Sequence, residues 1–257
     1  MTLDTAVIPC GGRGTRLHPI TRWLPKEMLP IGLRPVLYWT LDEAADAGLL
    51  RAIIITNPHK PLLEAAARTY EGPLELEFVP QDHPRGLGDA LLRARDQLAG
   101  SPFLTLLPDN LFQGPNPSAA VVTAFRATGL ATVLLTEIAR EDSAAKGPTV
   151  RATVRPTADG TLRVTEVADK GTGRFETGTE AAALTPIGRM AFPCGILEEF
   201  EEVGRGLPAG VELDDVPVLQ RLARRDALAG VINQAAFFDV GVPEGYRDAV
   251  SAFPVRV

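Results

Sequence analysis

The chain has 257 residues, of which 45% are apolar and 23% are charged, and its formal net charge is −6. This composition is ordinary for a globular protein with a sizeable core. The acidic balance disfavours binding to nucleic-acid polymers, which depends on basic surfaces. It does not exclude a nucleotide, because a nucleotide needs only a local cationic cleft.

Several classes of protein are disfavoured by features that the sequence lacks. The N-terminus shows no basic segment followed by an apolar run, so we expect no signal peptide. No apolar stretch reaches the roughly 18 residues of a membrane span. Cys10 and Cys194 are the only cysteines, and two distant thiols favour a reduced, cytoplasmic protein over a disulfide scaffold. The three histidines do not cluster, so a zinc site is not expected.

The first predicted element is a short buried strand, Ala6 to Ile8, which leads into a glycine-rich turn. Glycines bring backbone N–H groups close to a ligand, and a turn of successive N–H groups makes an anion-binding concavity. Arg16 and Lys26 add two cations, so the turn is suited to phosphates. The residues of this candidate loop are Gly11, Gly12, Gly14 and Thr15.

Two well-known phosphate loops are excluded by spacing. A dinucleotide-binding fingerprint that starts at Gly12 would need glycine at position 17, where this chain has Leu17. A P-loop would need a Gly-Lys-Ser/Thr triplet, and none follows these glycines.

The first half of the chain then alternates strand-like and helix-like segments, which predicts an α/β fold with a mostly parallel, Rossmann-like sheet and helices on both faces. Ligands of such sheets bind at the carboxyl ends of the strands, where the glycine turn and Asp109 both fall. The expected helices are 36–50, 61–69, 89–98 and 117–128, and the expected strands are 52–56, 74–79, 103–107 and 131–138.

The second half is expected to be smaller and richer in strand. Residues 150–156 and 162–167 alternate around Asp159-Gly160 and predict a hairpin. Helices are expected at 195–203, 216–225 and 243–253, with strand over most of 228–240. We therefore expect a single domain, 1–257, with a nucleotide-binding half of about 1–140 and a sugar-phosphate-binding half of about 141–257.

The whole string from Thr5 to Pro30, with Thr15-Arg16 and Pro25-Lys26-Glu27-Met28-Leu29-Pro30, resembles the signature of the sugar-1-phosphate nucleotidyltransferases. It is most similar to the bacterial UDP-glucose pyrophosphorylases of that family. The resemblance implies the nucleotide-diphospho-sugar transferase fold. It also implies transfer of a nucleotidyl group from a nucleoside triphosphate to a sugar 1-phosphate, with release of pyrophosphate, and often a dimer or tetramer.

The resemblance also implies which residues do the chemistry. Nucleotidyl transfer depends chiefly on positioning and charge neutralisation, which requires cations and metal-binding carboxylates. Arg16, Lys26 and Lys170 are the expected catalytic cations. Asp109, after the apolar run 103–107, and Asp239, in Phe237 to Gly241, match the aspartates that hold the catalytic Mg²⁺ in the family.

Base recognition is expected from Gln81 with Gly86 and Gly88. A glutamine amide offers both a donor and an acceptor, which suits the edge of uracil or thymine. Glycines at 86 and 88 would let the base and ribose lie against the backbone. In the family, a glutamine and this glycine motif read the base.

Sugar recognition is expected from Gly147, Asp169 and Lys170, which match the family only loosely. Asp169 replaces a glutamate and Gly171 a proline, with Ala168 inserted, and these changes bear on the identity of the sugar more than on the reaction. Gly188-Arg189 also occupies a place where the family has a sugar-pocket glycine.

Three hypotheses follow. The first is a Mg²⁺-dependent uridylyltransferase that acts on UTP and glucose 1-phosphate. The second keeps the chemistry with dTTP, because Asp109 to Phe112 resembles the glucose-1-phosphate thymidylyltransferases. The third is a non-catalytic regulatory domain that binds a nucleotide sugar, although such a domain would not need the metal-binding carboxylates.

Overall fold

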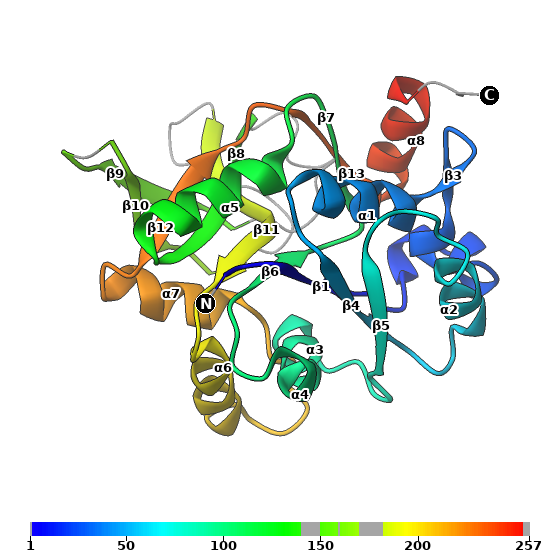
Figure 1. Ribbon diagram of the computed structural model, residues 1–257, viewed down its shortest axis with the longest axis horizontal. Coiled ribbons are helices and arrows are strands. Elements are labelled where there is room, and N and C mark those ends of the chain that lie inside the picture. Colours follow the sequence, from blue (N-terminus) through cyan, green and yellow to red (C-terminus); the bar gives the residue numbers. More distant parts are fainter. Residues whose placement is uncertain (1, 140–149, 159, 170–181, 254–257) are drawn as a thin grey trace.

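The computed structural model describes residues 2–139, 150–158, 160–169 and 182–253. Nine strands form one twisted central sheet, in the order β5-β4-β1-β6-β11-β8-β12-β10-β9 (Figure 1). These strands are β1 (Thr5–Pro9), β4 (Arg51–Thr56), β5 (Glu75–Pro80), β6 (Phe103–Leu106), β8 (Ala131–Ala139), β9 (Ala152–Pro156), β10 (Leu162–Val167), β11 (Ala182–Phe192) and β12 (Leu228–Ile232).

Two short antiparallel pairs lie outside the central sheet, namely β2 (Pro30–Ile31) with β3 (Arg34–Pro35) and β7 (Asn110–Gln113) with β13 (Ala236–Asp239). The helices are α1 (Val36–Asp46), α2 (Pro61–Ala67), α3 (Leu87–Arg93), α4 (Arg95–Leu98), α5 (Pro117–Thr128), α6 (Ile196–Arg205), α7 (Val216–Arg224) and α8 (Pro243–Ala252). Three 3₁₀ turns follow the glycine loop: η1 (Thr15–Leu17), η2 (Ile20–Arg22) and η3 (Lys26–Met28).

The predicted α/β class is confirmed, with one parallel block and one mixed block. Strands β5, β4, β1 and β6 run parallel, as the strand–helix alternation of the first half requires. Strand β11 joins this block to β8 in antiparallel orientation, and β9 and β10 form the predicted hairpin. Strand β11 belongs to the second half of the chain, so the division into a nucleotide half and a sugar half stays a prediction.

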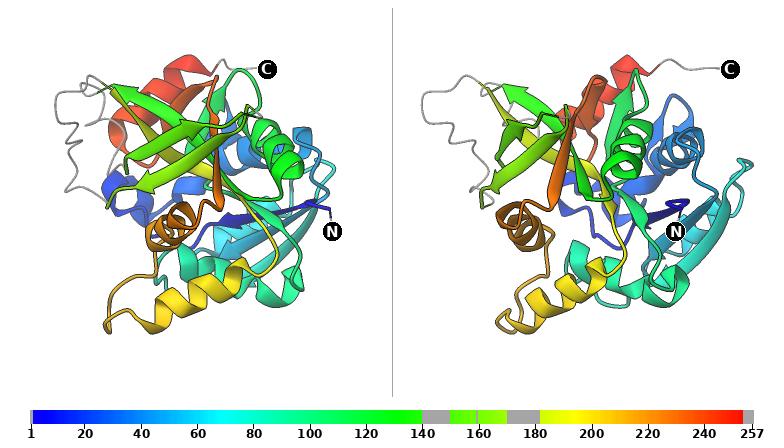
Figure 2. Two further views of the ribbon diagram at one scale, coloured as in Figure 1. Left: turned by 90° about the vertical axis from the view of Figure 1, so that its left-hand side faces the viewer. Right: turned by 60° about the vertical axis from the view of Figure 1, so that its left-hand side comes forward.

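Helices cover both faces of the sheet, as Figures 1 and 2 show. The side chains of β1 alternate between the two faces, because successive residues of a strand point in opposite directions. Ala6 and Ile8 pack in the cluster that contains the buried faces of α1 and α5. Val7 packs in the cluster that contains those of α3, α6 and α7. This double burial explains why β1 is a continuous apolar run.

Three segments differ from the sequence-based expectation. The central strand β11 was not predicted, because Pro186 and Gly188 interrupt its pattern and coincide with an irregular register against β8. The stretch 228–240 is two strands in different sheets. The predicted helix 89–98 is broken at Ala94 into α3 and α4. None of the helices in the described ranges is long and apolar enough to cross a bilayer.

Candidate active site

The glycine loop and the loop with Asp109 lie at the same edge of the sheet. They follow β1 and β6, which are neighbouring parallel strands, so their carboxyl ends coincide. Lys26 in η3 reaches across to Asp109, and its Nζ forms an ion pair and hydrogen bond with Asp109 Oδ2. The structure thus brings Lys26 and Asp109 together across 83 residues of sequence.

Asp239 reaches this edge by a route that the sequence did not reveal. It ends β13, which pairs with β7 rather than with the central sheet, and lies opposite Asn110 in that two-stranded ribbon. The N–H of Val240 donates to the carbonyl oxygen of Asp109 at 2.8 Å. Asp109 and Asp239, which the resemblance assigns to one Mg²⁺ ion, therefore do converge, and the β7–β13 ribbon brings Asp239 there rather than a strand of the central sheet.

Gly241 lies between the two carboxylates. A Cβ on Gly241 would be 2.9 Å from Asp109 Oδ2, closer than Cβ atoms come in real structures, and 3.0 Å from Asp239 Oδ1, which is tighter than most such contacts. The N–H of Gly241 also donates to Asp239 Oδ1 at 2.9 Å. Glycine at this position lets both carboxylates approach one point.

The two aspartates differ in protonation behaviour. Burial and the neighbouring Asp109 carboxylate raise the pKa of Asp239 from 3.8 to about 6. Burial alone would also raise the pKa of Asp109, but the charge and hydrogen bond of Lys26 outweigh it and lower this pKa. Lys26 thus stabilises the ionised form of Asp109. Ionisation of Asp239 remains unfavourable, because the nearby cations do not offset its burial and the charge of Asp109.

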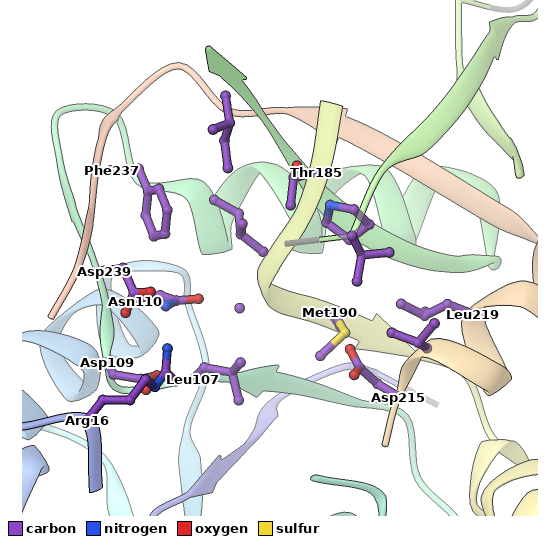
Figure 3. Close-up of a pocket in the computed structure, with 16 residues that line it drawn as sticks. Arg16, Leu107, Asp109, Asn110, Thr185, Met190, Asp215, Leu219, Phe237 and Asp239 are labelled. Atoms are coloured by element: carbon purple, nitrogen blue, oxygen red, sulfur yellow. The ribbon is translucent and has the colours of Figure 1, made fainter. Parts of the chain in front are cut away.

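A pocket of about 270 Å³ opens beside these residues. Figure 3 shows Arg16, Asp109, Asn110 and Asp239 along one side of it, and Met190, Asp215 and Leu219 across from them. Arg16 is exposed, and its positive charge acts on both Asp109 and Asp239. The pocket therefore combines a cation with the carboxylates of Asp109 and Asp239 on one side and that of Asp215 on the other, and the side with Arg16 suits a metal-bound polyphosphate.

The aspartate pair fits a magnesium ion. Both side chains offer hard oxygen donors, and Mg²⁺ in nucleotide sites uses one or two carboxylates while phosphates and water supply the remainder. A cation between them would relieve the repulsion that raises the pKa of Asp239. In the described part of the chain, no group of three or more metal-binding side chains is present.

We expect Asp239→Asn to stabilise the metal-free protein at neutral pH. A carboxyl whose pKa is raised on folding contributes stability that is fully present below pH 3.8 and lost as the pH rises through about 6. Above pH 6 the wild type keeps a destabilising buried charge, and the variant avoids a cost of roughly 3 kcal/mol. Urea unfolding in a chelating buffer at pH 7.5 and at pH 4 measures this difference.

The control for this experiment is Asp226→Asn, since Asp226 is exposed and its side chain forms a surface ion pair with Arg155. The gain from Asp239→Asn is expected to shrink at pH 4. A variant less stable than wild type at pH 7.5 would contradict the assigned cost.

A second buried ion pair fixes the glycine loop. Glu27 is completely buried, and both its carboxylate oxygens accept from Lys60 Nζ at 3.0 Å. Lys60 Nζ also donates to the carbonyl oxygen of Cys10 at 2.7 Å, and the Asn57 amide donates to that of Gly11 at 3.2 Å. Glu27 belongs to the Pro25-to-Pro30 motif, whereas no pattern in the sequence singles out Lys60.

The predicted nucleotide-binding residues lie around this loop. Gly11 is buried against Gln81, whose Oε1 would be 2.2 Å from a Cβ at position 11. Gly12 has open space on the same measure. Gly14 takes a left-handed conformation (φ 65°) as the loop enters η1, which begins at Thr15. These positions fit a loop whose backbone approaches a ligand, and their role stays a prediction.

Gln81 and the glycines at 86 and 88 also have structural contacts of their own. Gln81 is 2% exposed, and its Nε2 donates to Asp89 Oδ2 at 2.7 Å. A Cβ on Gly86 would lie 2.3 Å from the carbonyl oxygen of Leu213, and one on Gly88 would meet the Leu213 side chain at 2.6 Å. Close packing against the loop before α7 therefore requires both glycines, whether or not a base lies beside them.

The predicted sugar residues are only partly described. Gly147 and Lys170 lie outside the described residues. Asp169 is exposed at the end of β10, and its Oδ1 accepts from Gln220 Nε2 at 2.8 Å. Gly188 lines the pocket, but Arg189 is completely buried and does not. Of the loosely matched pair Gly188-Arg189, only Gly188 therefore lies at the pocket.

Sequence reasoning missed several residues that line the pocket. Asp215 precedes the proline-containing first turn of α7, which is a recognisable helix start. Asn110 directly follows the predicted metal ligand. Thr185 and Met190 belong to β11, and no pattern in the sequence indicated that strand.

Comparison with known proteins identifies the family of the chain. The nucleotidyl transferase family model matches residues 5–161. The UTP–glucose-1-phosphate uridylyltransferase 2 of Staphylococcus saprophyticus is 27% identical, with 95% of this chain and 89% of that protein aligned. The UTP–glucose-1-phosphate uridylyltransferase of Klebsiella pneumoniae is 28% identical, with 98% and 92% aligned.

A solved structure agrees with these relatives. A UDP-glucose pyrophosphorylase complexed with UDP-glucose superposes with a TM-score of 0.83 at 25% identity, and the match covers 98% of each chain. The family model spans more than half of the chain and includes the glycine loop, Lys26 and Asp109. The resemblance carried by the N-terminal motif is thereby confirmed, and the chain belongs to the nucleotidyl transferase family.

Proposed function

We propose that this protein transfers a uridylyl group from UTP to glucose 1-phosphate and releases pyrophosphate. The observation that carries the proposal is the convergence of Asp109 and Asp239 on Gly241, with Lys26 on Asp109 and Arg16 at the same pocket. The full-length relatives named as UTP–glucose-1-phosphate uridylyltransferases favour UTP and glucose 1-phosphate over other substrate pairs.

In the proposed reaction, a phosphate oxygen of the sugar 1-phosphate attacks the α-phosphorus of UTP. The bond between the α-phosphorus and its bridging oxygen to the β-phosphate breaks, and pyrophosphate leaves with the electron pair. The nucleophile is already an anion, so no general base is needed. The protein must instead align the two substrates and neutralise their charges.

The pocket residues divide this work. Arg16, which lines the pocket, and the exposed Gly12 of the glycine loop would bind the β- and γ-phosphates that become pyrophosphate. Asp109 and Asp239 would hold Mg²⁺, which when bound supplies charge neutralisation between the triphosphate and the sugar phosphate. Lys26 holds Asp109 ionised. Lys170 remains the proposed contact to the sugar phosphate.

We expect pyrimidine triphosphates to be better substrates than ATP or GTP by about a hundredfold or more in kcat/KM, because a site that hydrogen-bonds a base edge rejects mismatched bases strongly. UTP with glucose 1-phosphate should be the best pair. The measurement is pyrophosphate release with five nucleoside triphosphates, each crossed with several sugar 1-phosphates.

The same panel separates the remaining hypotheses. Higher kcat/KM with dTTP than with UTP would favour the thymidylyltransferase hypothesis. Binding of UDP-glucose without pyrophosphate release from any pair would favour a regulatory binding domain. A preference for ATP or GTP would contradict the assignment of Gln81, Gly86 and Gly88 to a pyrimidine.

A further inference from the structure

Arg189 on β11 is completely buried at the junction of three segments of the chain. All five N–H donors of its guanidinium are used. Nε donates to Glu43 Oε1 at 2.7 Å, and Nη2 donates to Glu43 Oε2 at 2.6 Å. The other donors bond the carbonyl oxygens of Leu107 at 3.0 Å, Gly188 at 2.8 Å and Asn110 at 2.9 Å. No other side chain offers five donors in one rigid plane.

Two of these carbonyl groups are the ends of the turn that presents Asp109. The N–H of Asn110 closes this turn by donating to the carbonyl oxygen of Leu107 at 3.1 Å. Arg189 therefore holds the backbone on both sides of Asp109. Asn110 is also the residue opposite Asp239 in the β7–β13 ribbon, so the same contact supports the position of the second carboxylate.

Glu43 is itself held in place on α1. The Ser118 hydroxyl on α5 donates to Glu43 Oε1 at 2.5 Å, and the Asn116 amide donates to the Glu43 carbonyl oxygen at 2.9 Å. The Phe112 ring of β7 lies against the guanidinium, 4.8 Å from Arg189 Cζ to the ring centroid. The guanidinium thus has one fixed orientation, set by α1, α5 and β7.

A buried ion pair of this kind is a poor source of stability. Desolvation of both charges offsets most of their attraction, and well-packed apolar side chains of similar size are often equally stable. The pair does not touch the pocket, since neither Arg189 nor Glu43 lines it. Its hydrogen bonds to Leu107 and Asn110 instead point to a role in the geometry of the turn.

We propose that Arg189 and Glu43 form a positioning pair that sets the Asp109 turn for binding a divalent cation together with the nucleotide phosphates. The inference rests on the proposed function, because it assigns the purpose of the turn to the metal. Loss of the Arg189 hydrogen bonds should let Asp109 move relative to Asp239 and so weaken binding of the cation. The glycine loop after β1 should stay unchanged.

The test compares Arg189→Lys and Glu43→Gln with Arg51→Lys. Arg51 is the matched control, because its guanidinium also pairs with a carboxylate, that of Glu77, and also donates to a backbone carbonyl oxygen, that of Gln97. Arg51 begins β4, so it lies at the opposite end of that strand from the candidate site. Two quantities are measured: the Mg²⁺ concentration for half-maximal pyrophosphate release, and Mn²⁺ binding in the presence of UTP by electron paramagnetic resonance. Residues that support metal ligands typically contribute 10–100-fold to metal affinity. We therefore expect Arg189→Lys to raise the half-maximal Mg²⁺ concentration and the Kd for Mn²⁺ by about tenfold each.

Glu43→Gln should shift both quantities in the same direction, and Arg51→Lys should change neither. Arg189→Lys that loses thermal stability while Mg²⁺ dependence and Mn²⁺ binding stay at wild-type values would show a purely structural role and overturn the inference. If Arg189→Lys does not fold, Glu43→Gln decides, and unchanged Mn²⁺ binding overturns the inference. Failure of the proposed function is a different result, namely no pyrophosphate release by the wild type with any substrate pair.

Discussion

Replacing Asp109 or Asp239 with asparagine is expected to lower the kcat of pyrophosphate release by about a thousandfold, because a bound metal supplies several kcal/mol of charge stabilisation and each 1.36 kcal/mol is tenfold in rate. Asparagine keeps the shape of the side chain but removes the negative charge that attracts the cation. The measurement is kcat at saturating UTP, glucose 1-phosphate and Mg²⁺.

The two variants should differ in stability although they share the loss of activity. Asp109→Asn leaves the largely buried Lys26 ammonium without its partner carboxylate, which destabilises the fold. Asp239→Asn removes a repulsion from Asp109. Asp226→Asn, on the exposed surface, is the control and should leave kcat unchanged. Near-normal turnover by either site variant would place the metal on other ligands.

Arg16→Ala is expected to lower kcat by about a hundredfold or more, since it removes a positive charge directed at the developing pyrophosphate. Arg16 lines the pocket beside Asp109, where we propose that the triphosphate and the metal bind (Figure 3). A contact that strengthens in the transition state changes kcat more than the KM for UTP. Steady-state kinetics with UTP as the varied substrate separates the two constants.

Arg22→Ala provides the matched control for that experiment. Arg22 is an exposed arginine of the neighbouring turn η2, so its removal changes the net charge of the protein equally. We expect wild-type kcat for this variant. An Arg16→Ala enzyme with normal kcat and only a raised KM would reduce Arg16 to a binding residue.

Local sequence patterns were sufficient for most helices and strands of the parallel block. Helix α5 begins at Pro117 after the N-cap Asn116 and ends before Gly129 in a left-handed conformation, so both boundaries were readable. Strand β11 was not readable, because burial at the centre of a sheet removes alternation and Pro186 disguises the rest. Its neighbours in the sheet come from distant parts of the sequence.

The candidate site shows the same division. The motif containing Lys26 and the strand before Asp109 pointed to both residues, since each lies next to a recognisable local signal. The partnership of Glu27 with Lys60, and of Glu43 with Arg189, carried no such signal. The members of the first pair are 33 positions apart and those of the second are 146 positions apart. Charged residues are also ordinarily expected to be exposed to solvent.

The sequence by itself determined the family, and its resemblance to that family pointed to Asp109 and Asp239. The glycine loop and the strand before Asp109 were also readable directly, because glycines, prolines and apolar runs act through local backbone physics. Only the tertiary structure decided how those groups meet. Asp239 approaches Asp109 because β13 leaves the central sheet and pairs with β7. Gly241 fits between the carboxylates because it has no Cβ, and Arg189 holds the Asp109 turn from inside the core. Such contacts depend on which distant segments pack together, and that choice is made by the free energy of the whole fold.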